Sequence, residues 1–238
     1  MFYTITKKTF IIIIVIMLGL AMPIAIGITV TESSPKAQFM VVIDAGHGGI
    51  DEGVLGVTTK FPESDLNLAV AKLVKKYFET ADINVVMTRS TKEGLYGIKS
   101  SGFKSRDMNN RKKIIEEAEP DIVLSIHMNY YSSPIRRGLQ VFYSESGKSK
   151  DLADEIQNVA NLNLNMPIIK RNLTELYGDY FICKCSDCPS VIVECGFLSN
   201  PLDEALLMST DYQEELAYYI FTGVMNYINC NLSVENTN

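Results

Sequence analysis

The sequence predicts a single α/β domain: a mostly parallel, twisted sheet with helices on both faces, preceded by an N-terminal hydrophobic segment. Strand-like and helix-like segments alternate from residue 39 onward. The strand-like segments are continuous apolar runs, such as 41–43 and 191–193. Parallel strands have this character because both of their faces are covered. With 238 residues and 47% hydrophobic content, the chain is long enough to bury one core.

The expected elements follow in order along the chain. Apolar residues recur at helical spacing over 66–78, and Ser64 or Asp65 is expected to cap that helix. The polar, glycine-containing stretch 91–104 is expected to be a loop, and Pro120 ends the helix after it. Strands are expected at 39–43, 83–87, 122–126, 138–143 and 191–193, and helices over 66–78, 105–117, 152–160 and 210–228.

The first thirty residues have the pattern of an export signal. Lys7 and Lys8 precede an uncharged apolar run, 10–30, which is about the ~20 residues that a membrane-spanning helix needs. We therefore expect residues 1–30 to be a signal peptide or a membrane anchor, with cleavage left open. The polar stretch 31–38 reads as a linker, 39–230 as the functional domain and 231–238 as a tail. The domain is expected to work outside the cytoplasm, either anchored to the membrane or secreted.

Charge argues against one class of partner. The formal net charge is −6, and acidic and basic residues are interspersed. Because no basic stretch is visible in the sequence, we expect no nucleic-acid partner.

Both histidines of the chain follow apolar strands. His47 comes after 41–43, within the glycine-rich stretch Asp44-Ala45-Gly46-His47-Gly48-Gly49, and His127 comes after 122–126. Glu194 directly follows 191–193. Active sites of such sheets form at the carboxyl ends of the strands. Two imidazoles and a carboxylate, with one position left for water, are the ligand set of a catalytic zinc site.

The chemistry requires a second carboxylate, because one must bind the metal and another must act as the base. Glu63 is well placed, since it lies at the end of a glycine-rich loop just before the first helix. Asp51, Glu52 and Asp65 are alternatives that spacing alone does not exclude.

The five cysteines allow other interpretations. Cys183, Cys185 and Cys188 have a spacing compatible with a structural zinc site or with a disulfide in an exported protein, although free thiols are the leading interpretation. Cys195 next to Glu194 also raises the alternative of a thiol-dependent hydrolase that uses His127. The cysteines of the chain are Cys183, Cys185, Cys188, Cys195 and Cys230.

Five blocks, in order, resemble the zinc-dependent N-acetylmuramoyl-L-alanine amidases of the amidase-3 family. They are VVIDAGHGGIDEGVLG, ESDLNLAV, VVMTRS, DIVLSIHMN and PSVIVECGFLSN. The resemblance implies that Zn²⁺ is held by His47, Glu63 and His127, and that Glu194 is the catalytic residue. It selects Glu63 over the alternative carboxylates. The implied reaction is hydrolysis of the amide bond between N-acetylmuramic acid and L-alanine in peptidoglycan.

A short amidase with an N-terminal anchor and no binding repeats resembles the CwlD group of spore-forming bacteria. This implies removal of stem peptides from the spore cortex, on the way to the muramic-δ-lactam needed for germination. A vegetative cell-wall amidase is the alternative within the family, and a non-catalytic wall-binding domain is the alternative outside enzymes. Because no wall-binding module is visible, a protein activator or regulator of unknown identity is also expected.

Overall fold

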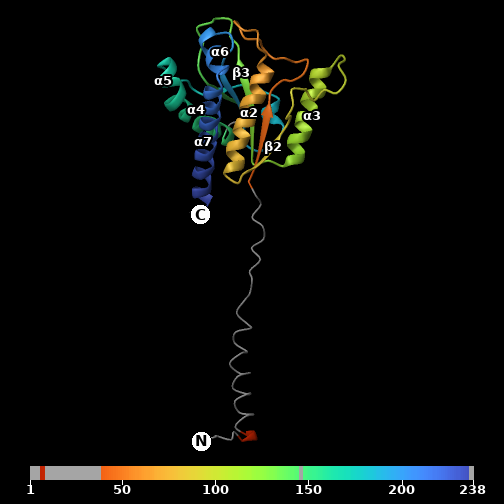
Figure 1. The fold of residues 1–238 in the computed structure, drawn as a ribbon, viewed down its shortest axis with the longest axis vertical. Helices are drawn as coiled ribbons and strands as arrows, with labels where there is room; N and C mark the ends of the chain where they lie inside the picture. The colour runs from red at the N-terminus through yellow and green to blue at the C-terminus, as the bar shows by residue number, and fades with distance from the viewer. Residues whose placement is uncertain (1–5, 9–38, 145–146, 236–238) are drawn as a thin grey trace, which may run out of the picture. The chain divides into compact units, whose positions relative to one another are not determined.

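The computed structural model describes residues 6–8, 39–144 and 147–235. From Phe39 onward the chain is one unit built around a six-stranded sheet in the order β2-β1-β3-β6-β4-β5 (Figure 1). The strands are β1 (Met40–Ala45), β2 (Asn84–Met87), β3 (Ile122–Asn129), β4 (Gln140–Tyr143), β5 (Leu176–Tyr177) and β6 (Ser190–Phe197). β2, β1, β3 and β6 are mutually parallel, whereas β4 runs antiparallel to β6. The prediction of a mostly parallel α/β sheet is confirmed.

Helices cover both faces of this sheet. One face packs on α2, α4 and α7, and the other on α3 and the short 3₁₀ turn η2. Successive side chains of a strand point to opposite faces. In β1, for example, Val41 and Ile43 belong to the larger core cluster and Val42 to the smaller one. The helical segments are α2 (Glu63–Thr80), α3 (Phe103–Ala118), α4 (Lys148–Ala160), the π-helical η1 (Asn161–Asn165), α5 (Met166–Ile169), η2 (Ile182–Lys184), α6 (Pro201–Leu207) and α7 (Thr210–Glu235).

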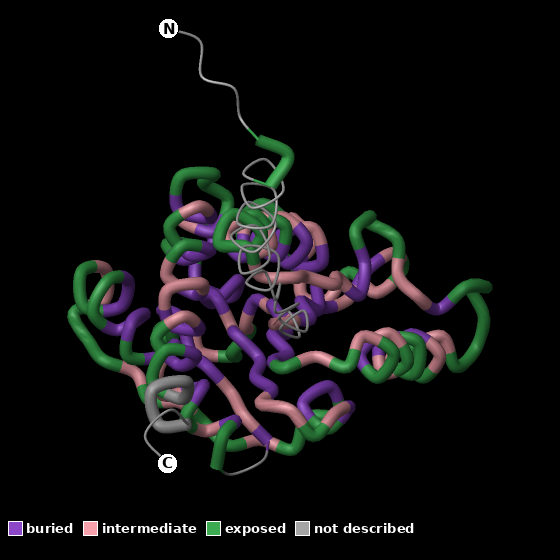
Figure 2. Tube along the Cα trace, turned by 90° about the horizontal axis from the view of Figure 1, so that it is seen from below, coloured by how far each residue is buried: buried purple, intermediate pink, exposed green. Residues whose placement is uncertain are grey.

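Helix α2 shows why the apolar spacing predicted these elements. Leu66, Val70, Val74 and Phe78 recur every four residues and are all buried against the sheet. The buried residues of the domain line the strands and the inner sides of the helices, as Figure 2 shows. The expected cap at Ser64 or Asp65 is wrong. The helix begins at Glu63, with the extended Pro62 as its N-cap.

Strands β3 and β6 are longer than expected, and this determines which way His127 and Glu194 point. β3 extends to Asn129 and β6 to Phe197, so His127 and Glu194 lie within strands rather than just past them. The continuous apolar pattern gives way to alternation there. Met128 and Cys195 stay in the core, while His127 and Glu194 face the other side.

The expected signal or anchor (1–30) and linker (31–38) lie outside the described residues, apart from 6–8. In the part of the chain that the structure describes, no helix has the length and apolar character needed to cross a membrane. At the other end α7 continues to Glu235, past the start of the expected tail at residue 231.

Candidate active site

His47 lies in the loop after β1, in an unusual backbone conformation. Its φ is +61°, a region that residues with side chains seldom occupy. The preceding residue must be glycine for a different reason. A Cβ on Gly46 would lie 2.1 Å from Cε1 and 2.2 Å from Nε2 of His127. The absence of a side chain at Gly46 therefore lets the two histidines approach each other.

Two buried arginines hold this loop by its carbonyl oxygens. Arg111 of α3 donates to the carbonyls of Ala45 (2.8 Å) and His47 (2.5 Å). Arg89, just after β2, donates to the carbonyls of Ala45 and Gly46, both at 2.8 Å. Neither arginine was among the residues predicted to be functional. Arg89 lies two residues after the end of β2, which is close to the signal that pointed to the histidines.

The charge of Arg111 is balanced inside the protein. Its guanidinium contacts Asp44 and Asp107, each at 2.6 Å. Burial alone would raise the pKa of Asp44, but Arg111 and the hydroxyls of Ser125 and Thr88 outweigh it and hold the pKa at about 2. The loop that carries His47 is therefore fixed by a buried ion-pair network as well as by the sheet.

Glu63 is the first residue of α2, and its carboxylate is fully engaged. Oε2 accepts from the backbone N–H of Val54 at 2.9 Å. Oε1 accepts from the Asn67 side chain at 3.1 Å and from the N–H of Met128 at 3.2 Å. The loop turns at Gly53 (φ +70°), where a Cβ would lie 2.4 Å from Oε2 of Glu63.

The structure brings His47, Glu63 and His127 together. Oε1 of Glu63 lies 3.0 Å from Nδ1 of His127 and 3.3 Å from Nε2 of His47. One possible ligand atom from each residue lies within 4.8 Å of the others. The imidazoles are 26% and 20% exposed, whereas Glu63 is only 3% exposed. Two nitrogen donors and one carboxylate, open on one side, fit a catalytic zinc ion with a fourth position left free.

The alternative carboxylates Asp51, Glu52 and Asp65 are not part of this His–Glu–His group. Asp51 contacts the other ring nitrogen of His47, Nδ1, at 3.0 Å, which leaves Nε2 directed at Glu63. Such a carboxylate typically orients a metal-binding histidine. Asp65 pairs with Lys92 at 2.5 Å, and Glu52 is exposed.

The charges of the cluster reinforce one another. Burial lowers the pKa of His47, but hydrogen bonds and charge interactions with Asp51 and Glu63 outweigh it and raise the pKa to about 9. Burial likewise opposes ionisation of Glu63, but the two imidazoles hold the pKa of its carboxyl well below the usual range. The folded protein therefore favours a protonated His47 imidazole beside an ionised Glu63 carboxylate.

Glu194 lies beside this cluster. Its Cα is paired with that of His127 across the β3–β6 ladder, and both side chains face the α3 side of the sheet. The residue keeps some exposed surface, but its Oε2 is buried without a hydrogen-bond partner. Burial raises the pKa of the carboxyl to about 7. A carboxyl group in this state can exchange a proton at neutral pH.

The cysteines stand apart from this chemistry. Cys195 is fully buried on the opposite face of the sheet from His127, and burial strongly raises the pKa of its thiol. Burial also raises the pKa of Cys183 to about 12 and that of Cys185 to about 11. Within the described ranges, only His47, Glu63 and His127 form a group suited to a metal ion. The interpretations of Cys195 as a nucleophile and of a cysteine zinc site therefore have no support in this geometry.

A cavity of about 290 Å³ opens onto the cluster. Both imidazoles line it, together with Tyr180, Phe181 and Met108. A partly open His–Glu–His group beside a buried carboxyl, at the carboxyl edge of an α/β sheet, is the arrangement of a metal-dependent hydrolase.

Comparison with known proteins specifies that class. Residues 41–226 match the family model described as N-acetylmuramoyl-L-alanine amidase, so the chain belongs to this amidase family, whose substrate is peptidoglycan. The germination-specific N-acetylmuramoyl-L-alanine amidase of Bacillus subtilis is 32% identical over 199 residues, which is 82% of each chain. The CwlD amidase from Clostridioides difficile, solved in complex with the GerS lipoprotein, has a TM-score of 0.77 at 31% identity. That match covers 81% of this chain and 100% of the other. The catalytic domain of CwlV from Bacillus (Paenibacillus) polymyxa has a TM-score of 0.68 at 30% identity, over 81% of this chain and 99% of its own.

Proposed function

We propose that the protein is a zinc-dependent amidase that removes stem peptides from spore cortex peptidoglycan, as a step toward the muramic-δ-lactam needed for germination. His47, Glu63 and His127 hold the zinc ion, and Glu194 is the catalytic acid and base. One observation carries the proposed chemistry: Oε2 of Glu194 is buried without a partner beside the His–Glu–His group. An unsatisfied carboxylate oxygen is costly, which is expected where a group is kept for reaction rather than for stability.

His47, Glu63 and His127 would hold the zinc ion, which when bound would supply positive charge to polarise the scissile carbonyl and make a nearby water easier to deprotonate. The protein residues supply the remaining steps. Glu194 accepts the proton of the attacking water and returns it to the nitrogen of the leaving L-alanine. Its pKa of about 7 suits both transfers at neutral pH. Asp51, at 3.0 Å from Nδ1 of His47, keeps Nε2 of that ring directed into the cluster.

Glu194→Gln tests this role directly. The variant keeps the shape of the side chain but cannot accept the proton, so we expect hydrolysis of purified peptidoglycan to fall about 100- to 10,000-fold. Zinc content, measured by elemental analysis, should remain at the wild-type level. Glu52→Gln is the matched control, because Glu52 is an exposed acid in the loop after β1 and lies outside the cluster. Full activity in a zinc-loaded Glu194→Gln variant would contradict the role of Glu194.

The proposal of a cortex substrate rests on the relative from Bacillus subtilis that is named germination-specific and matches over 82% of both chains. A vegetative cell-wall amidase is the second candidate. The amidase LytC of the same organism is 28% identical over 79% of this chain, although the match covers only 35% of LytC. Muropeptide analysis of spores from a deletion strain separates the two. We expect cortex without muramic-δ-lactam, and normal lactam content would exclude the cortex role.

Location and partner follow from the substrate. Because peptidoglycan lies outside the cytoplasmic membrane, we propose export by the N-terminal segment, which then anchors the enzyme or is cleaved. We also propose a protein activator or regulator, since the similar CwlD amidase was solved in complex with the GerS lipoprotein. Affinity purification of the exported protein from sporulating cells, with and without crosslinking, tests for such a partner. Recovery of the amidase alone under both conditions would count against it.

A further inference from the structure

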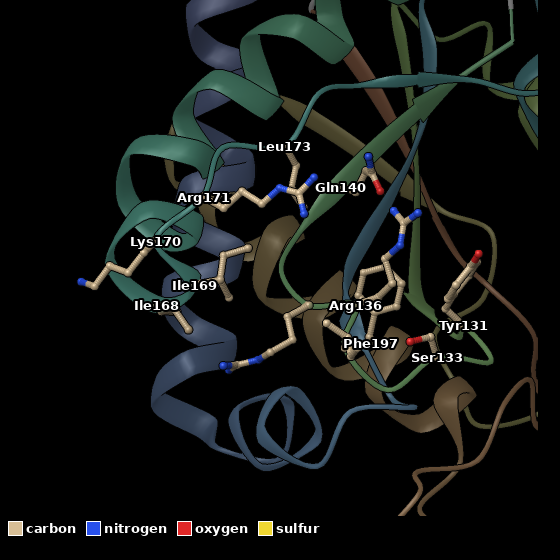
Figure 3. Close-up of a pocket in the computed structure, with 12 residues that line it drawn as sticks. Tyr131, Ser133, Arg136, Gln140, Ile168, Ile169, Lys170, Arg171, Leu173 and Phe197 are labelled. Atoms are coloured by element: carbon tan, nitrogen blue, oxygen red, sulfur yellow. The ribbon is translucent and has the colours of Figure 1, made fainter.

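A second cavity lies beside the candidate active site and has no role so far. It measures about 500 Å³ and opens between the segment after β3 and the end of α5 (Figure 3). None of the candidate metal ligands lines it. The aromatic, amide and basic side chains that line it include Tyr131, Arg136, Arg137, Gln140, Lys170 and Arg171.

The register of the sheet fixes the distance between this cavity and the reaction centre. Gln140 of β4 is paired with Glu194 of β6, which is itself paired with His127 of β3. The three side chains face the same side of the sheet, because their neighbours Leu139, Val141, Val193 and Ile126 belong to the larger core cluster. Gln140 is therefore two strand spacings, about 10 Å, from His127. An extended peptide covers that distance with about three residues.

The cavity carries uncompensated positive charge. Arg137 is paired with Asp203 at 2.8 Å and is thereby neutralised. Among the described residues, no carboxylate lies within 4.0 Å of Arg136, Lys170 or Arg171. Arg136 stacks at 4.8 Å over the ring of Tyr131. Arg171 extends toward the Gln140 side of the cavity in Figure 3, whereas Lys170 points away and donates to the carbonyl of Pro167. Arg171 and Arg136 are thus the cations that a ligand in the cavity would meet.

The stem peptide and the N-acetylmuramic acid of the substrate differ in charge. The stem peptide beyond L-alanine carries carboxylates, whereas N-acetylmuramic acid, once joined to the peptide by an amide, has none. Arginine binds carboxylates through two parallel donors. The other cavity has Tyr180 and Phe181 in its wall. Its two cations, Lys104 and Arg111, are already paired with carboxylates of the same wall.

We infer that the cavity between the 131–137 segment and α5 is the binding site for the carboxylate-bearing stem peptide, with Arg171 and Arg136 as the partners of its carboxylates. The inference rests on the proposed reaction centre at His47, Glu63 and His127. It sets the direction in which the substrate lies along this face of the sheet. The peptide extends toward β4, and muramic acid lies toward the cavity lined by α3.

The test uses two substrates that differ in one charge. N-acetylmuramoyl-L-alanyl-D-glutamate has free α- and γ-carboxylates on its second residue, whereas the D-isoglutamine form has an amide at the α position and keeps only the γ-carboxylate. We expect the wild-type enzyme to have a KM about fivefold lower for the acid, as for a partly exposed ion pair. Arg171→Gln should raise the KM for the acid to that for the amide, and Arg136→Gln is a second variant at the same cavity. Lys72→Gln is the charge-matched control, because Lys72 is exposed on α2 and does not line the cavity.

A binding measurement separates this inference from the proposed reaction. Calorimetry with metal-free protein compares L-alanyl-D-glutamate with L-alanyl-D-isoglutamine and needs no turnover. Preference for the acidic dipeptide that disappears in Arg171→Gln supports the cavity, even if neither substrate is hydrolysed. Equal KM values for the two substrates in the wild-type enzyme, or a preference that survives in both arginine variants, overturns the inference and leaves the reaction centre untouched.

Discussion

The guanidinium of Arg111 donates to the backbone carbonyl of His47 at 2.5 Å, although 64 residues separate them in the sequence. This bond holds the one residue of the cluster whose backbone has a positive φ, +61°. A strained conformation of this kind persists only where the surrounding contacts determine it. The geometry of the site therefore depends on a side chain that does not belong to it.

Replacing Arg111 should disturb the site before the fold is lost. Arg111→Lys keeps the positive charge but cannot reach Asp44, Asp107 and the two carbonyls at once, because an ammonium lacks the planar fork. We expect a loss of about 2–4 kcal/mol in the free energy of unfolding, measured with urea. We also expect weaker zinc binding in a chelator competition. Arg106→Lys, on the same helix but bonded to an exposed loop, is the control and should keep its zinc affinity.

Glu194→Gln should stabilise the metal-free protein at neutral and higher pH. The pKa of this carboxyl is raised from 4.5 to about 7 in the folded state. Between these values the unfolded chain has already released a proton that the folded protein still holds, so the stability of the wild type falls as pH rises through the window. The amide cannot ionise and avoids this loss.

The charges of His127, Glu63 and His47 act on the pKa of Glu194, and all three residues remain in the variant. Urea unfolding in the presence of a chelator should show no difference between variant and wild type near pH 4. Above pH 7 the variant should lead by about 3 kcal/mol. A constant difference across the range would contradict the assignment of the titration to Glu194.

Gly46→Ala should impair metal binding more than it impairs folding. The new methyl group would lie 2.1 Å from the His127 ring, so the ring must move out of the cluster. We expect at least a tenfold loss of zinc affinity, in line with displaced ligand-orienting groups. Gly97→Ala is the comparison, because its Cβ meets nothing within 4 Å although its φ is +69°. That control should lose about 1 kcal/mol of stability and no zinc affinity.

Activity should depend on metal and not on thiols. Cys195 is completely buried with a raised pKa, so its thiolate is scarce and inaccessible to reagents. Iodoacetamide should leave the native enzyme active, while a strong chelator should abolish hydrolysis and added zinc should restore it. Cys195→Ala should remain active and lose about 1–2 kcal/mol of stability from the small cavity it creates. Loss of activity on alkylation, with activity retained in chelator, would point back to thiol chemistry.

Much of the fold and part of the site could be predicted from the sequence. Apolar runs and helical spacing placed the strands and helices, and the rule for strand ends located His47, His127 and Glu194. Strand ends themselves were misjudged, because Val193 and Glu194 look like a boundary in sequence while the ladder continues to Phe197. Glu63 could not be chosen over Asp51 by spacing. Hydrogen bonds from Val54, Asn67 and Met128 distinguish Glu63, and these arise only in the folded chain.

The residues that hold the candidate site in place could not be recognised from the sequence pattern. Arg111 is an ordinary charged residue of a polar helix in the sequence, and its burial depends on Asp44 and Asp107 lying beside it in space. The cavity next to Gln140 was not foreseen either. Its charge comes from two segments more than thirty residues apart, 131–137 and 168–173, which only the folded chain brings together.

The proposed peptide site and the proposed reaction centre come from different parts of the chain. Apart from Phe197, every residue that lines the proposed peptide site falls between Tyr131 and Leu173, in the stretch that joins His127 to Glu194. The proposed reacting groups, His47, Glu63, His127 and Glu194, lie outside this stretch on either side. Natural variation within it can therefore change which peptides an amidase accepts without altering the groups that cut the bond. Exchanging residues 131–173 between two relatives should therefore be enough to transfer the preference for one stem peptide over another.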